Sequence, residues 1–387
     1  MWANRGNETT LVTYGGILKG AFVGVPSFKV IDAAGRFTDD PDVTRIGGRL
    51  RGRSFRSLWK RLRLQWRTLR TAFALLESAH YDVIYVFSGH PLVLLLAVRL
   101  FGKDTSKDRT GVVLHLIYPE RLSRTGRPRW QPGDWLYRKA LLGLLRRDRV
   151  ALRVLDQPFK QALINRLQLK PSLSDRVTVV PHGVDSFDGP GDRAEARRRL
   201  GLSLDETIFL FFGVLRKNKR YDTVIQAMGG LSSCRLLIAG PPLDLDANDL
   251  HSLIQQYGCE RSVSLEIGFV EDTRMRDYFL AADAVIITYA KSFVGSSGVL
   301  FHACTYGRCV IGGDVGIIGP TVKENGIGFA VEPENPEALR RAMRELMALP
   351  PEERTRMEQR ALALAQKESW DAVCAQLEAF CSGLVDH

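Results

Sequence analysis

Cysteine is scarce in this sequence, and the few cysteines form no paired pattern. All six lie in the C-terminal half, and no pair has the CxxC spacing. They therefore provide no disulfide framework of the kind found in secreted proteins. We expect reduced thiols, a cytoplasmic protein and no metal site.

Long apolar runs are also absent. The longest, Pro91–Val98, ends at Arg99, whereas about 20 apolar residues are needed to cross a bilayer. The opening residues, MWANRGNETT, contain no apolar segment that would direct secretion. These absences predict a protein with neither a membrane span nor a secretory signal.

Acidic residues are few in the first half. Residues 1–185 contain 32 lysines and arginines against 15 aspartates and glutamates, a net charge of +17, whereas residues 186–387 have a net charge of −6. This asymmetry indicates an anionic partner for the first half. An anionic membrane surface fits, since each nearby basic residue contributes about 1 kcal/mol of attraction. Nucleic acid is the competing polyanion, which charge alone does not exclude.

The most basic stretch, Val43–Leu76, has ten basic residues and no acidic one. Its apolar residues recur at three- and four-residue steps: Leu58, Leu62, Trp66, Leu69, Phe73 and Leu76. This spacing predicts an amphipathic helix with its apolar stripe toward the core. Basic residues lie mostly off the stripe: Arg56, Lys60, Arg63, Arg67 and Arg70.

The N-terminal segment allows two interpretations. Phe28–Asp32 (FKVID) is typical of a short strand, and apolar residues at 11, 14, 18 and 22 have helical spacing despite a Gly-Gly pair. We expect a helix over Glu8–Phe22, with the first strand shortened or absent. The alternative places a first strand at Thr10–Tyr14.

The length of 387 residues, 45% of them hydrophobic, predicts two domains, because single cores stop growing at about 250–300 residues. In the second half, strands and helices alternate as in a parallel sheet. Successive strands are expected at Phe209, Leu236, Ser264, Ala284, Cys309 and Gly328. The last stretch, Glu352–Leu384, is expected to be helical.

Two loops of the second half have features of an anion site. The buried strand Ala284–Thr288 leads through the loop Val294–Gly298 into a helix over Val299–Tyr306. The start of a helix presents backbone N–H groups that attract phosphate. The strand within Ile208–Arg220 ends in a glycine and four basic residues. Because both loops follow strands of one predicted sheet, they are expected to face one crevice.

Several segments together resemble the retaining glycosyltransferases of family four, over residues 176 to 350. The matching segments are VVPHGVD (Val179–Asp185), FFGVLRKNKRYDTVIQAM (Phe211–Met228), LLIAGPP (Leu236–Pro242), YFLAADAVIITY (Tyr278–Tyr289), SSGVLFHACTYGRCVI (Ser296–Ile311) and GIGFAVEPENPEAL (Gly326–Leu339). The resemblance implies the GT-B fold, an α/β architecture of two Rossmann-like parallel-sheet domains facing a central cleft. It further implies an acceptor domain at 1–185 completed by a helix at about 369–387, a linker at 186–196 and a nucleotide-sugar-binding domain at 197–368.

The implied activity is transfer of a sugar from a nucleoside diphosphate donor, a UDP- or GDP-sugar, to a glycan or lipid-linked acceptor. Retention of configuration and a role in cell-envelope or exopolysaccharide synthesis also follow from the resemblance. The donor is a substrate, so no permanently bound cofactor and no nucleic acid are expected. The enzyme would be cytoplasmic and peripheral on the inner membrane.

The resemblance also assigns site residues. Arg216 and Lys219 match a G-x-x-R-x-x-K arrangement of cations that stabilise the leaving diphosphate. The family often has a first-domain histidine near the transferred sugar. Here it corresponds to His115, with His90 as the other candidate. Nucleotide-binding residues are expected at Gly213, Ser296, Ser297, Gly298, Val299, Leu300, His302, Phe269 and Val270.

One departure from the family pattern affects the donor site. The family usually has two glutamates eight positions apart, and here these positions are Val294 and His302. We expect His302 to contact the donor ribose through a ring nitrogen. Because both acids are missing, two alternatives stay open: a non-catalytic GT-B protein that binds a nucleotide sugar or glycan, and a GT-B sugar-nucleotide epimerase.

Overall fold

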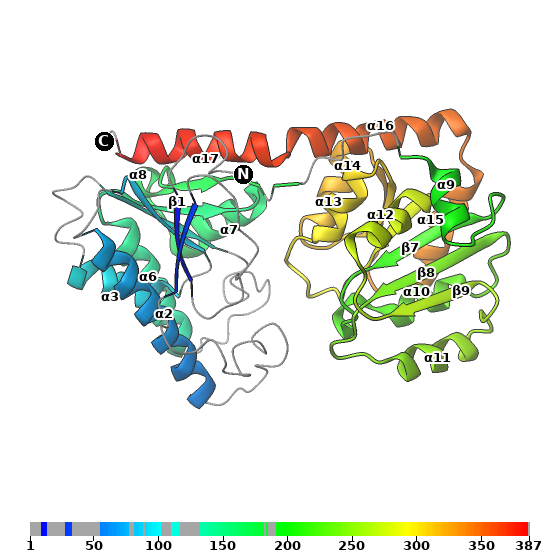
Figure 1. The fold of residues 1–387 in the computed structure, drawn as a ribbon, viewed down its shortest axis with the longest axis horizontal. Coiled ribbons are helices and arrows are strands. Elements are labelled where there is room, and N and C mark those ends of the chain that lie inside the picture. The colour runs from blue at the N-terminus through cyan, green and yellow to red at the C-terminus, as the bar shows by residue number, and fades with distance from the viewer. Residues whose placement is uncertain are drawn as a thin grey trace. The chain divides into compact units, whose positions relative to one another are not determined.

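The computed structural model describes residues 9–13, 28–32, 55–76, 81–87, 90–101, 110–116, 132–181, 183–184 and 191–385. Contacts divide the chain into two compact units, residues 1–182 with 371–387 and residues 183–370. Each is an α/β unit with parallel sheets (Figure 1). Basic residues 43–54 and linker residues 186–190 lie outside the described part of the chain.

The first unit has a parallel sheet whose strands follow chain order. They are β3 (Val83–Phe87), β4 (Gly111–His115), β5 (Val150–Val154) and β6 (Val177–Val179). The helices of this unit are α2 (Phe55–Leu75), α3 (Pro91–Phe101), α6 (Pro132–Leu145), α7 (Gln157–Leu167), α8 (Pro171–Ser174) and nearly all of α17 (Trp370–Val385).

The expected N-terminal helix is wrong. Its described part forms strand β1 (Thr9–Thr13), which pairs in parallel with β2 (Phe28–Asp32) from Thr9↔Phe28 to Thr13↔Asp32. The alternative interpretation, a first strand near Thr10, is therefore correct. Threonine and valine favour strands, and pairing with a distant segment satisfies their backbone groups. Pairing with β2 therefore decided the structure of this segment, although its apolar residues have helical spacing.

The amphipathic helix is confirmed as α2. Its apolar stripe packs into the core of the first unit with α3 and α6, through Leu62, Trp66, Leu69, Phe73 and Leu76. Arg63 and Arg70 are exposed, and Arg67 is half-buried. The side chains of Arg56, Leu58 and Lys60 lie outside the described part. The helix therefore buries its apolar side and leaves arginines at the surface.

The second unit is built on a six-stranded parallel sheet in the order β12-β11-β10-β7-β8-β9. Its strands, at the six predicted places, are β7 (Thr207–Phe212), β8 (Cys234–Gly240), β9 (Val263–Ile267), β10 (Ala284–Ile287), β11 (Cys309–Gly313) and β12 (Gly328–Val331). Its helices are α9 (Arg193–Arg199), the short 3-10 helix η3 (Lys217–Lys219), α10 (Tyr221–Met228), α11 (Ala247–Gln256), α12 (Asp272–Ala281), α13 (Gly298–Thr305), α14 (Ile318–Asn325), α15 (Pro336–Ala348) and α16 (Pro351–Lys367). Helix α9 begins inside the predicted linker.

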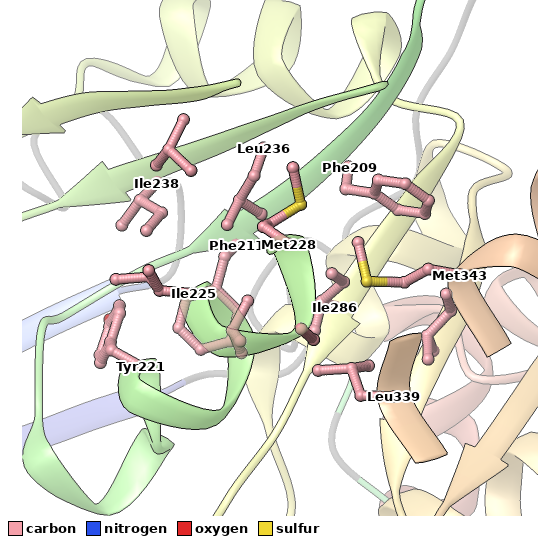
Figure 2. Packing of buried hydrophobic residues seen from close by; sticks show 14 of the residues in the cluster. Phe209, Phe211, Tyr221, Ile225, Met228, Leu236, Ile238, Ile286, Leu339 and Met343 are labelled. Carbon is pink, nitrogen blue, oxygen red and sulfur yellow. The ribbon is translucent and has the colours of Figure 1, made fainter. Parts of the chain in front are cut away.

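Helices cover both faces of this sheet. Phe209 and Phe211 of β7 face a cluster with α10 and α15, as Figure 2 shows. The alternate residues Ile208 and Leu210 face a second cluster with α12, α13 and α14. Strands covered on both faces need apolar residues at every position, which explains the unbroken apolar runs in the sequence.

The strand order places a reversal at the centre of the sheet. From β7 the chain adds β8 and β9 on one side, then crosses back to add β10, β11 and β12 on the other. Loops leaving β7 and β10 therefore run in opposite directions and separate at the carboxyl ends of these strands. In open α/β sheets ligands bind at such a point.

All six cysteines are buried and free of disulfides, as expected for reduced thiols. Burial raises the pKa of the Cys304 thiol to about 12, so this thiol stays protonated near neutral pH. Within the described ranges, no helix combines the length and the apolar character needed to span a membrane.

Candidate functional site

A pocket lies at the central reversal of the second unit. It is lined by the carboxyl ends of β7 and β10, the loop after β7 and the start of α13, through Phe211, Phe212, Lys219, Ile286, Ile287, Thr288, Tyr289, Ser297 and Val299. The fold thus brings together the basic loop and the glycine-serine loop, which the sequence predicted to face one crevice.

Lys219 is a buried cation in this pocket. Its side chain is only 7% exposed, and its Nζ donates to the Phe212 carbonyl over 2.9 Å. Burial, together with the charge of Arg216, lowers the pKa of Lys219 to about 8. No carboxylate pairs with Lys219 among the described residues. Because an ammonium has three donors, donors beyond the one to Phe212 can serve an anion.

The backbone around Lys219 is tied to the neighbouring strand. Its carbonyl accepts a hydrogen bond from Thr288 Oγ1 at 2.7 Å, just beyond β10. The carbonyl of Asn218 accepts from the Ala290 amide at 2.8 Å. These bonds connect the loops that follow β7 and β10 and fix Lys219 at the pocket.

Gly213 is required by close packing at the end of β7. Its φ of +96° lies in the region that favours glycine. A Cβ there would lie 3.1 Å from Lys219 Nζ and 3.5 Å from Val299 Cγ2. A Cβ on Gly240, at the end of β8, would lie only 2.3 Å from the Gly213 carbonyl oxygen. Glycine at both positions therefore lets the backbones pack closely, and at Gly213 it also leaves the space beside Lys219 open.

Helix α13 begins at the pocket wall. Ser297 is its N-cap residue, yet its hydroxyl makes no capping bond and lies 3.3 Å from the Tyr289 hydroxyl. Val299 lines the pocket, whereas Leu300 is fully buried in the core and its amide donates to the Ser297 carbonyl. The partial positive charge of a helix start is therefore next to the Lys219 ammonium.

The other residues predicted for this site lie around the pocket rather than in its wall. Arg216 is exposed and precedes η3. His302 is half-buried on α13, with its ring 5.7 Å from that of Phe279. Phe269 is 77% exposed after β9, while Val270 beside it is buried in the core. Of the remaining predicted residues, Ser296 is half-buried and Gly298 is exposed.

The two histidine candidates belong to the first unit. His115 ends β4 and is 1% exposed, with its ring 6.0 Å from that of Tyr85. His90 precedes α3: its Nδ1 accepts from the Leu92 amide at 3.3 Å, and its carbonyl accepts from two amides of the first turn. His90 thus caps a helix, and His115 is enclosed by its own unit.

Sequence reasoning missed Thr288 and Tyr289. Tyr289 is 9% exposed, stacks on Phe293 with ring centroids 3.9 Å apart, and faces Ser297 with its hydroxyl. Burial raises the pKa of this phenol. The available signal was the polar Thr-Tyr pair directly after a buried strand, since functional groups gather where strands end.

Comparisons with known proteins concern the fold and the sequence of the second unit. Solved structures share the fold: Anabaena HepE in complex with UDP-glucose has a TM-score of 0.61, 18% identity and 82% coverage of each chain. WaaG, a glycosyltransferase involved in lipopolysaccharide biosynthesis, has a TM-score of 0.66 and 15% identity, covering 99% of this chain and 93% of its own. The fold is the GT-B fold of glycosyltransferases.

One segment of the chain matches a family model. Residues 192–363, which surround the pocket, match the family model of glycosyl transferases group 1. The D-inositol 3-phosphate glycosyltransferase of Acidothermus cellulolyticus is 30% identical over 209 residues, which cover 51% of this chain and 46% of that protein. The protein of the same name from Mycobacterium avium is 31% identical over 203 residues, with the same coverage. The chain spans about half the length of these relatives.

Proposed function

We propose that this protein is a glycosyltransferase that moves a sugar from a nucleoside diphosphate, UDP or GDP, to a glycan acceptor. The observation that carries the proposal is the buried Lys219 ammonium beside the start of α13, at the central reversal of the sheet. A buried cation costs free energy unless it meets an anion. The match of the surrounding segment to glycosyl transferases group 1 supports a diphosphate as that anion.

The chemistry follows from the charge that develops on the donor. When the bond between the sugar and the diphosphate breaks, its electron pair goes to the diphosphate oxygen, while the acceptor hydroxyl oxygen forms the new bond and its proton passes to the departing diphosphate. Lys219, Arg216 and the start of α13 would stabilise the departing diphosphate, and Gly213 leaves room for it. Retention of configuration rests on the family resemblance. A catalytic role for His115 stays a prediction.

The test is turnover of UDP- and GDP-sugars, measured as donor hydrolysis or transfer. Replacing Arg216 and Lys219 by alanine should remove about 3 kcal/mol of transition-state stabilisation for each group, and thus abolish measurable turnover. Lys217→Ala is the matched control, since this exposed lysine lies in the same loop outside the pocket. Unchanged turnover in the double variant would overturn the assignment. Nucleotide-sugar binding by a wild-type protein without turnover would favour the non-catalytic alternative.

The acceptor is proposed to be lipid-linked and reached at an anionic membrane surface. Helix α2 buries its apolar stripe and exposes Arg63 and Arg70, and residues 1–185 have a net charge of +17. Headgroup attraction would hold this unit peripherally on the inner membrane without a spanning helix. A polysaccharide of the cell envelope fits such an acceptor.

A further inference from the structure

An ion pair beside the pocket joins two residues with unusual backbone. Arg220 has φ +57° and Glu334 has φ +59°, in the left-handed region that favours glycine. Their side chains meet with Arg220 Nη1 2.9 Å from Glu334 Oε1. Side chains in this region persist where the surrounding structure holds them, often near functional sites. Glycine at either position would relieve the backbone and lose the pair.

The pair connects distant parts of the sheet. Arg220 directly follows Lys219 and leads into α10, after the central strand β7. Glu334 follows β12 at the edge of the sheet, with β11 and β10 between. The side chains thus meet across the carboxyl ends of four strands. Arg220 is also oriented by Asp222, whose Oδ2 lies 2.6 Å from its Nη2.

The same carboxylate oxygen holds the second loop of the pocket. Glu334 Oε1 accepts a hydrogen bond from the Lys291 amide at 3.2 Å, in the loop between β10 and α13. The preceding residue, Ala290, donates its amide to the Asn218 carbonyl. One oxygen atom therefore binds the loop that ends in Arg220 and the loop that leads to Ser297.

We propose that Glu334 is a positioning residue that holds these two loops at the spacing required for the diphosphate. Glu334 is not among the residues that line the pocket, and it acts through Arg220 and Lys291. The expected effect on nucleotide binding rests on the proposed function. The connection between the loops is a property of the unliganded protein and is testable by itself.

The first test is amide hydrogen exchange of the segment 288–293 in the unliganded protein. Glu334→Gly should speed exchange there about tenfold, because the loop loses a direct acceptor and its link to Arg220. Arg220→Gly should have a smaller effect in the same segment. The double variant should resemble Glu334→Gly, since residues that act as a unit are not additive.

Thermal stability separates positioning from a merely structural role. Arg220→Gly and Glu334→Gly each remove the ion pair, which destabilises the protein, and relieve a left-handed backbone conformation, which stabilises it. The melting temperature should therefore stay within about 3 °C of wild type. Ser233→Gly relieves the same backbone strain (φ +59°) ahead of β8, away from both loops. Glu332→Gln removes a carboxylate near the Lys291 Nζ and spares Arg220. Both controls should leave exchange of 288–293 unchanged.

The second test is calorimetric binding of UDP and GDP to the full chain. Glu334→Gly should weaken the affinity for whichever nucleotide the wild type binds by about five- to tenfold. Glu334→Gln keeps an acceptor for the Lys291 amide and should recover part of that loss. Unchanged exchange at 288–293 in Glu334→Gly, or wild-type affinity despite altered exchange, would overturn the inference. A wild-type protein that binds neither nucleotide counts against the proposed function, while the exchange result still decides whether Glu334 joins the loops.

Discussion

Replacing Lys219 by methionine should stabilise the unliganded protein and remove nucleotide binding. Methionine has a similar length and no charge, so it suits the apolar wall of Phe211 and Phe212. The wild-type ammonium is buried without a carboxylate partner among the described residues, which is unfavourable until an anion binds. Stability and function are therefore expected to conflict at this one position.

The magnitude follows from the pKa of Lys219, which is about 8 in the folded protein and about 10.4 for a lysine in water. The unfolded chain therefore binds the extra proton between these pH values, so wild-type stability rises with pH across that window. Below pH 8 the full cost applies, about 3 kcal/mol at 1.36 kcal/mol per pH unit. Losing the hydrogen bond to the Phe212 carbonyl returns about 1 kcal/mol. Methionine should then add about 2 kcal/mol at pH 7.

The assay is thermal unfolding at pH 7 and at pH 10.5. At about 2–4 °C per kcal/mol for a unit of this size, Lys219→Met should melt about 4–8 °C above wild type at pH 7, with the advantage lost at the higher pH. Lys217→Met, two residues away and exposed, should change neither value. A Lys219→Met protein that is no more stable than wild type at pH 7 would refute the reasoning.

Three further predictions concern other residues. Asp283→Asn should lower the free energy of unfolding by about 3–5 kcal/mol in urea titrations, because the buried Arg197, 2.6 Å from its Oδ2, loses its counter-charge. The control is Asp277→Asn, whose partner Arg199 is exposed, and it should cost less than about 1 kcal/mol. Equal effects of the two substitutions would contradict this prediction. His302→Ala should weaken donor binding by about 1–2 kcal/mol by calorimetry, whereas unchanged affinity would contradict a contact between the imidazole and the ribose. Flotation with anionic vesicles should be lost at high salt and on charge reversal of α2, and binding that ignores lipid charge would remove the membrane proposal. The positions to change to glutamate are Arg63, Arg67 and Arg70.

Much of the second unit could be read from the sequence because its strands are covered on both faces. A continuous apolar run such as Ala284–Thr288 has few alternatives to a buried strand, and β10 is found at Ala284–Ile287. The glycine-serine loop and the helix after it follow from local propensities. The first strand was missed because Thr9–Thr13 depends on a partner 19 positions further along the chain, which spacing within one segment does not reveal.

In the second unit the sequence by itself determined which segments form strands and helices, and which loops have basic or glycine-rich character, since these depend on neighbouring residues. The sequence also predicted that the two loops face one crevice, but only the tertiary structure decided the strand order, which places the ends of β7 and β10 side by side at one pocket. Burial of Lys219 and the pairing of Arg220 with Glu334 were decided there too. The physical reason is that desolvation and ion pairing depend on groups far apart in the chain, whose proximity exists only after the sheet has formed.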